Sequence, residues 1–151
     1  MVYNTCTAIE AVRSLSRLGI VIEGAAIKEG VESTVMPART ELIKKKPVVI
    51  LDGGHNEGCM RALRAMAEKY LSDRKITLLM ASMKDKDYKK GLEIILPVCE
   101  NAVFTCTDEI RGEKAETLSL CAADLGKKAC AEGNYIKALE KAADMKINCV
   151  A

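Results

Sequence analysis

The chain has 151 residues, of which 23 are basic and 21 acidic, so its formal net charge is only +2. This balance predicts no extended basic face, and 3% aromatic residues offer few platforms for base stacking, so nucleic-acid binding is not expected. The 49% of hydrophobic and 29% of charged residues are typical of a globular chain and exclude a disordered one.

The cysteines and the single histidine indicate in which cellular compartment the chain is expected and whether it can bind a metal. The seven cysteines are odd in number and irregularly spaced, form no C-x-x-C pair, and therefore predict neither a disulfide framework nor a zinc or other metal site. No apolar stretch approaches the roughly 20 residues that span a bilayer, and the first residues lack a signal-peptide core. We therefore expect a cytoplasmic protein that does not bind membranes.

The first part of the chain predicts helices. Residues 4–18 carry an apolar stripe at Ile9, Val12 and Leu15, with Asn4 or Thr5 as a possible cap, and a second helix is expected at about 25–32. Two helices cannot enclose a core, so residues 1–36 are interpreted as the helical tail of a domain that is otherwise absent.

A break in the pattern follows these helices. Met36-Pro37-Ala38-Arg39 interrupts the helical periodicity, and the charge run Lys44-Lys45-Lys46 beside Pro47 is typical of a solvated segment. Residues 37–46 are therefore predicted to be a linker between the helical tail and a domain over residues 47–151.

Strand and helix patterns alternate regularly after Pro47. Continuous β-branched and aliphatic runs indicate strands that are buried on both faces, and their alternation with amphipathic helices predicts a three-layer α/β/α domain. The Rossmann-like sheet should be mostly parallel, with five to six strands. The strands are expected at 48–51, 76–80, 102–106, 128–131 and 147–150, and the helices at about 56–70, 88–99, 118–125 and 135–143.

The turn after the first buried strand is the candidate site. Asp52 and His55 stand at the carboxyl end of this strand, the edge at which open α/β sheets bind ligands, and Asn56 can cap the following helix. The turn is no dinucleotide fingerprint, because His55 replaces the middle glycine. It is no Walker A loop either, because Cys59-Met60 replace the Lys-Ser pair. A simpler alternative stays open, in which His55 only bonds a loop carbonyl.

Several segments resemble one family of ligases. Asp52-Gly53-Gly54-His55-Asn56 is similar to the D-G-A-H-N segment of folylpolyglutamate and dihydrofolate synthases, which are relatives of the Mur ligases. Met36-Pro37-Ala38-Arg39 with Glu41 resembles the W-P-G-R-x-E segment of that family. The other resembling segments, in matching order, are the helix led by Asn4, the D-K-D loop at Lys84-Asp85-Lys86-Asp87, and Arg111 after the next strand.

The resemblance implies an activity and assigns residues. Enzymes of this family use ATP and Mg²⁺ to phosphorylate a folate or dihydropteroate carboxylate, and the amine of L-glutamate then attacks the acyl phosphate. ATP and Mg²⁺ would be bound mainly by the missing N-terminal ATPase domain, so the isolated chain is expected to be inactive. By analogy, Asn4, Arg39 and Asp52 would contact ATP, and His55 would act in catalysis by positioning glutamate or phosphate. The loop residues Asp85, Asp87 and Arg111 would face the substrate or the other domain.

Other interpretations remain open from the sequence. Asn4 can be merely a helix cap, Arg39 a surface charge of the linker, and Asp85 and Asp87 acids of a first helical turn. The chain also departs from the family at Met36, Ala38 and Gly54, and ends before the usual Gly-Ser after the last strand. A Mur-type or cyanophycin-like ligase with another acceptor, or a non-enzymatic α/β binding module, would fit the same pattern.

Overall fold

The computed structural model describes residues 2–107, 110–145 and 148–150 and divides into two units, Met1–Pro37 and Ala38–Ala151. The first unit contains α1 (Val2–Ser14), the 3₁₀ helix η1 (Leu15–Leu18) and α2 (Gly24–Ser33). None of its described residues is buried. Asn4 lies inside the first turn of α1 and does not cap it, because the helix already begins at Val2. As expected, two helices alone make no core.

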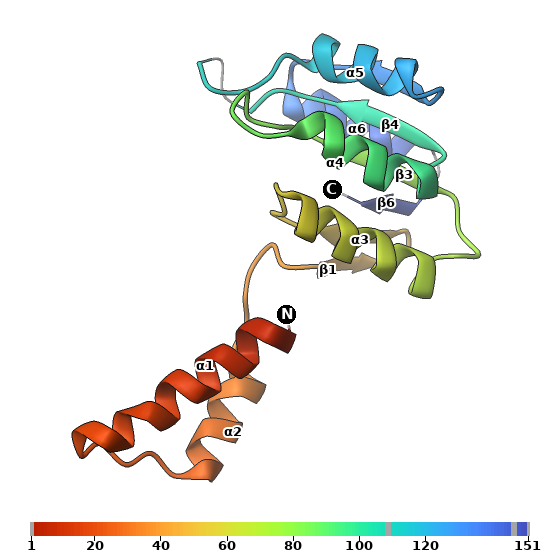
Figure 1. Cartoon of the computed structure of the whole chain (residues 1–151). Helices are drawn as coiled ribbons and strands as arrows, with labels where there is room; N and C mark the ends of the chain where they lie inside the picture. The colour runs from red at the N-terminus through yellow and green to blue at the C-terminus, as the bar shows by residue number, and fades with distance from the viewer. Residues whose placement is uncertain (1, 108–109, 146–147, 151) are drawn as a thin grey trace. The chain divides into compact units, whose positions relative to one another are not determined.

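The second unit is built on one six-stranded sheet (Figure 1). The strand order is β1-β2-β6-β3-β4-β5, with β1 antiparallel to β2 and every other pair parallel. This arrangement confirms the prediction of a mostly parallel sheet. The strands are β1 (Glu41–Lys45), β2 (Val48–Leu51), β3 (Ile76–Met80), β4 (Asn101–Phe104), β5 (Lys128–Ala131) and β6 (Asn148–Val150).

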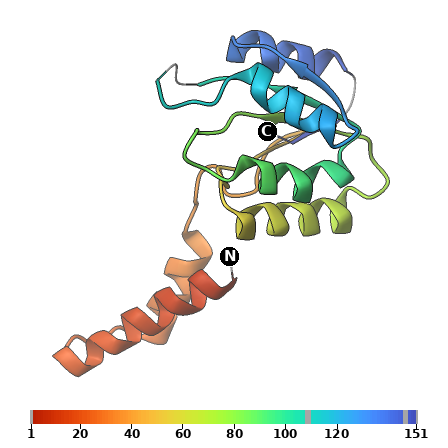
Figure 2. The same ribbon diagram turned by 45° about the horizontal axis from the view of Figure 1, so that its top comes forward.

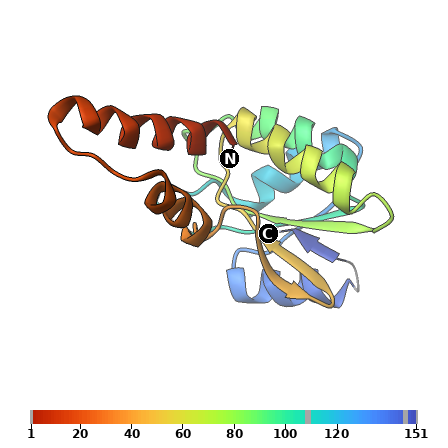
Figure 3. The ribbon, with the colours of Figure 1, turned by 90° about the horizontal axis from the view of Figure 1, so that it is seen from below.

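Helices lie on both faces of this sheet. The helices α3 (Glu57–Tyr70), α4 (Tyr88–Ile95) and α5 (Ala115–Asp124) cover one face, and Figure 2 shows α3 and α4 side by side. Helix α6 (Tyr135–Asp144) lies on the opposite face, as Figure 3 shows. Alternation along β4 explains the two layers, because Phe104 packs into the core with α3, α4 and α5 while Val103 packs on Ala138 and Ala142 of α6.

The core and the helix caps together fix the carboxyl edge of the sheet. Leu92, Phe104 and Leu118 are fully buried. Asn56 caps α3 by accepting a hydrogen bond from the amide of Cys59 (2.9 Å), and Asp87 caps α4 by accepting one from the amide of Lys90 (3.1 Å).

In the part of the chain that the structure describes, no helix has the length and apolar character to cross a membrane.

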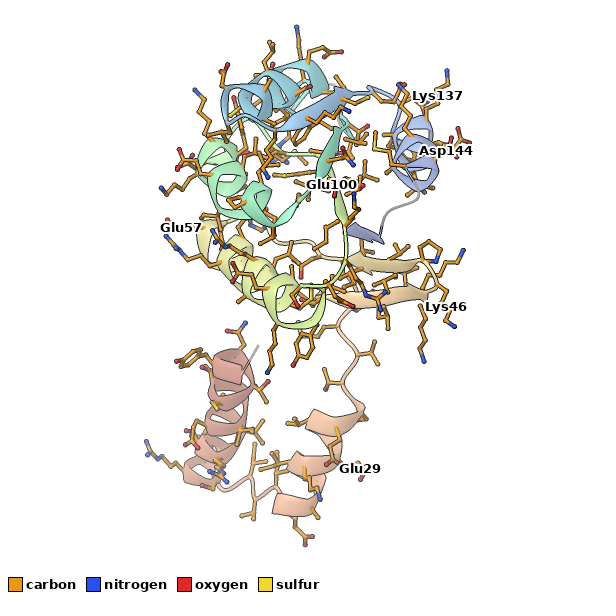
Figure 4. All side chains as sticks on the ribbon, turned by 90° about the vertical axis from the view of Figure 1, so that its right-hand side faces the viewer. Glu29, Lys46, Glu57, Glu100, Lys137 and Asp144 are labelled. Carbon is orange, nitrogen blue, oxygen red and sulfur yellow. The ribbon has the colours of Figure 1, made fainter. Side chains whose placement is uncertain are left out.

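One segment differs from the sequence-based prediction. Residues 41–45 were expected to belong to a linker, but they form the edge strand β1, which pairs with β2 in the register Glu41↔Leu51 and Leu42↔Ile50. Backbone pairing with β2 outweighs the polar character of the lysines, and lysines are common on edge strands because they discourage further pairing. Figure 4 shows Lys46 at the tip of this hairpin.

Candidate functional site

The carboxyl ends of the parallel strands enclose a cleft of about 300 Å³. The turn after β2 (residues 52–56) forms one wall, and the loop after β3 (residues 81–83 and 86–88) forms another. Thr107, which follows β4, also contributes to the lining, and Met60 and Gly91 come from α3 and α4. Figure 4 labels Glu57, the first residue of α3, which directly follows the turn over residues 52–56. The edge of the sheet at which a site was predicted from the sequence therefore carries a cleft.

Asp52 uses its carboxylate to hold two turns together. Its Oδ2 accepts hydrogen bonds from the amide of Thr40 (2.8 Å) and from Thr40 Oγ1 (2.9 Å). Its Oδ1 accepts one from the amide of Gly54 (2.7 Å). A carboxylate offers about four acceptor positions, so one position of Asp52 remains for a further donor.

The turn over residues 38–40 has an unusual backbone. Ala38 (φ 54°) and Thr40 (φ 53°) both adopt left-handed conformations, which residues other than glycine rarely do. The amide of Gly53 donates to the carbonyl of Ala38 (2.7 Å), and the amide of Ala38 donates to Glu41 Oε2 (2.8 Å). Arg39 projects from this turn, exposed and without a hydrogen-bond or ion-pair partner among the described residues.

Gly54 is required by close packing rather than by its φ angle. A Cβ at this position would lie 2.6 Å from Asp52 Oδ1 and 2.7 Å from the Cβ of Cys59, closer than real Cβ atoms approach. The absence of a side chain therefore lets the turn fold back over the start of α3 while its amide bonds Asp52.

His55 is exposed and lines the cleft. Its Nδ1 lies 3.2 Å from the carbonyl oxygen of Gly53. In the tautomer in which Nδ1–H donates to that carbonyl, Nε2 becomes a free acceptor. The contact with a loop carbonyl that the sequence left as an alternative is thus present, and in this tautomer it orients the ring.

The loop after β3 pairs with the segment before α5. Met83 and Gly112 form an antiparallel bridge, and the amide of Glu113 donates to the carbonyl of Ser82 (2.8 Å). The Lys86 ammonium lies 3.3 Å from Asp85 Oδ2, and its hydrogen bond lowers the pKa of that exposed carboxyl, with a smaller contribution from the charge of Arg111. Asp85 and Arg111 therefore belong to one electrostatic group.

The structure brings together some of the predicted residues. Asp52, His55 and Asp87 line the cleft, whereas Asp85 and Arg111 lie outside its lining. Arg39 lies on the turn bonded to Asp52, and Asn4 is exposed on α1 in the other unit. Thr40 was not predicted from the sequence, since the resemblance indicated only its neighbours. Three lining residues, Ser82, Lys86 and Thr107, were also given no role from the sequence.

Comparisons with known proteins show the family of this chain. Residues 38–151 match the family model described as Mur ligase, glutamate ligase domain. The chain is 27% identical over 116 residues to the dihydrofolate synthase/folylpolyglutamate synthase of Bacillus subtilis. The matched region covers 76% of this chain and 27% of that protein. It is 32% identical over 114 residues to a probable bifunctional folylpolyglutamate synthase/dihydropteroate synthase of Halobacterium salinarum, covering 75% of this chain and 14% of that protein.

Solved structures share the fold. The structure of Escherichia coli FolC in complex with DHPP and ADP matches with a TM-score of 0.85 at 23% identity, over 97% of this chain and 34% of that one. Mycobacterium tuberculosis folylpolyglutamate synthase complexed with ADP and AMPPCP matches with a TM-score of 0.79 at 22% identity, over 90% and 33% of the two chains. The chain thus spans about a third or less of these relatives. The resemblance inferred from the D-G-G-H-N turn is confirmed, and the chain belongs to the Mur ligase family, in its glutamate ligase domain.

Proposed function

We propose that this chain is the C-terminal part of an ATP-dependent ligase that joins glutamate to a folate or dihydropteroate carboxylate through an acyl phosphate. In this proposal residues 1–36 are the end of a central ATPase domain, and that domain binds most of ATP and Mg²⁺. The names of the relatives, dihydrofolate synthase and folylpolyglutamate synthase, support the substrate class.

The observation that carries the proposal is an exposed arginine, Arg39, which has no partner among the described residues and lies on the turn bonded to Asp52 of the cleft. The turn after β2 in this domain is no Walker A loop. The guanidinium of Arg39 has a planar set of donors that suits phosphate oxygens, and its side chain is exposed. In this proposal another domain holds the nucleotide, and this domain contributes the guanidinium of Arg39 to its phosphate oxygens.

The remaining site residues take roles that fit their contacts. The free acceptor position of Asp52 suits a ribose hydroxyl, and the exposed Nε2 of His55 suits the ammonium of glutamate or a protonated phosphate oxygen. Asn4 would reach the nucleotide from the ATPase side, and the loop with Asp85, Asp87 and Arg111 would contact substrate or the other domain. Such groups act by orienting reactants and by stabilising charge.

Mg²⁺ does not fit the residues that the structure describes. Among the described residues no group of three His, Cys, Asp or Glu side chains is placed to hold a metal ion, and three of the acceptor positions of Asp52 are already used. No step of the reaction is therefore assigned to a metal ligand in this chain.

The test is a ligation assay of the longer protein that contains this chain. With ATP and L-glutamate, dihydropteroate and tetrahydrofolate are supplied in parallel, and glutamylated product and ADP are measured. Arg39→Ala should lower kcat/KM more than about tenfold, the loss expected for a charged hydrogen bond. Arg17→Ala, which removes another exposed arginine without a described partner, should not.

The possible outcomes separate the alternatives. Ligation with neither acceptor would refute the proposed substrate class, and activity with another carboxylate would instead support a different Mur-type amide ligase. Unchanged kinetics of Arg39→Ala would remove Arg39 from the site. The 151-residue chain alone should not turn over ATP, and steady hydrolysis by it would contradict the assignment of the ATPase to another domain.

A further inference from the structure

The backbone on both sides of Arg39 is held in a conformation that its residues do not favour. Ala38 and Thr40 have φ values of 54° and 53°. The left-handed conformation is unfavourable for any residue with a Cβ and is a genuine outlier for a β-branched residue such as Thr. Strain of this kind persists only where surrounding contacts determine the conformation, and it is concentrated at functional sites.

The contacts that impose this conformation come from Asp52. One carboxylate oxygen, Oδ2, accepts from both the amide and the hydroxyl of Thr40, at 2.8 Å and 2.9 Å. The other oxygen is fixed by the amide of Gly54, and the amide of Gly53 anchors the carbonyl of Ala38. Asp52 directly follows Leu51, the last residue of β2, so the turn over residues 38–40 is tied to the end of a sheet strand.

We propose that Thr40 and Asp52 form a clamp that fixes the direction in which Arg39 leaves the turn, so that Thr40 is a positioning residue for the ATP contact of Arg39. This role rests on the proposed function. Arg39 has no described partner of its own, so its position depends on the backbone that carries it. A turn that samples other conformations would spread the guanidinium over many positions and weaken each contact with a phosphate.

The clamp can be measured on the 151-residue chain without any ligase activity. Amide hydrogen exchange by NMR should show the amide of residue 40 protected in the wild-type chain. Thr40→Val removes the hydroxyl and keeps the β-branch, and exchange at this amide should become about tenfold faster or more, as expected for a weakened bond to a charged acceptor. Thr40→Ser, which keeps the hydroxyl, should restore protection. Exchange at the unprotected rate in the wild-type chain would overturn the proposal.

The role in positioning is measured in the longer ligase. Thr40→Val should lower kcat/KM for ATP about tenfold, mainly through KM, and Thr40→Ser should recover it. Because Thr40 acts through Arg39, Thr40→Val should cause no further loss in the Arg39→Ala background. Thr34→Val, which removes the hydroxyl hydrogen bond from exposed Thr34 to the carbonyl of Gly30, is the matched control and should leave the kinetics unchanged.

The outcomes distinguish the two proposals. An equal loss from Thr40→Val with and without Arg39 would mean that Thr40 does not act through Arg39, and this result overturns the positioning role. A wild-type ligase with no activity towards any folate acceptor would refute the proposed function and the positioning role together, while the exchange experiment still decides whether the clamp exists.

Discussion

Gly54→Ala is the substitution that tests the geometry of the site most directly. The resembling family motif carries alanine at this position, so the exchange looks conservative from sequence. In this structure the added Cβ would lie 2.6 Å from Asp52 Oδ1 and 2.7 Å from the Cβ of Cys59. Neither neighbour can move freely, because the carboxylate is bonded to Thr40 and Cys59 lies in the first turn of α3.

The expected magnitude follows from what must shift. Moving the carboxylate weakens a charged hydrogen bond worth about 1.5–3 kcal/mol, and moving the start of α3 carries an overpacking cost of about 1–3 kcal/mol. Either the carboxylate or the start of α3 must move to make room for the Cβ, so only one of these two costs applies. The lower entropy of the unfolded alanine chain offsets about 0.4–1 kcal/mol. We therefore expect Gly54→Ala to lower the free energy of unfolding by about 1–2 kcal/mol.

The assay is urea unfolding of the 151-residue chain followed by circular dichroism, with the slope m compared between variants. Gly91→Ala is the control. Its Cβ would lie 3.5 Å from Met60 Cγ of the neighbouring helix α3, which is an ordinary contact distance. Because alanine is a better helix former than glycine inside α4, this variant should gain up to about 1 kcal/mol. If Gly54→Ala is as stable as the wild type while Gly91→Ala behaves as expected, the close packing around Gly54 is refuted. Adding Cys59→Gly removes one overlap, so the double variant should lose less than the sum of the two single variants.

Two further predictions concern the turn at Arg39 and the core. Ala38→Gly relieves a left-handed alanine and should raise the free energy of unfolding by about 0.5–1 kcal/mol in the same assay, after the entropy cost of glycine; a loss would contradict the conformation at Ala38. Burial raises the pKa of the Cys99 thiol from 9.0 to about 12, so iodoacetamide at mildly alkaline pH should label exposed Cys6 long before Cys99 by peptide mass spectrometry. Because the folded-state pKa is the higher one, the contribution of Cys99 to stability is complete below pH 9.0 and is lost as the pH rises towards 12, and Cys99→Ala should flatten that loss.

The buried part of the fold could be predicted because each strand has its own sequence signal. The run Val48–Leu51 and the run Ile76–Met80 coincide with β2 and β3, and Lys128–Ala131 coincides with β5. Boundaries were less accurate where helix geometry changes, since α4 ends at Ile95 and a 3₁₀ turn containing Pro97 follows. Proline lacks the amide hydrogen that would continue the α-helix.

The contacts of the site could be predicted only in part. The position of Asp52 and His55 at a strand end follows from the alternation of elements, and the structure places both at the cleft. The bond between Asp52 and Thr40 could not be foreseen, because it joins residues twelve positions apart through a turn built on alanine and threonine. Turns with left-handed residues normally contain Gly or Asn at those positions, and the turn over residues 38–40 contains neither.

Strand β1, which was not predicted from the sequence, explains how the site is assembled. In the antiparallel register of β1 and β2, Glu41 faces Leu51. Continued by one residue, that register places Thr40 opposite Asp52, where the two hydrogen bonds of the clamp are found. The bulge between Leu42 and Lys44 lies on the hairpin side of these pairs, so it leaves the register at the site end undisturbed. The edge strand thus follows Arg39 at the carboxyl edge of the sheet, where the turn over residues 52–56 itself contains no lysine or arginine. Strand pairing holds the turn that carries Arg39 beside Asp52.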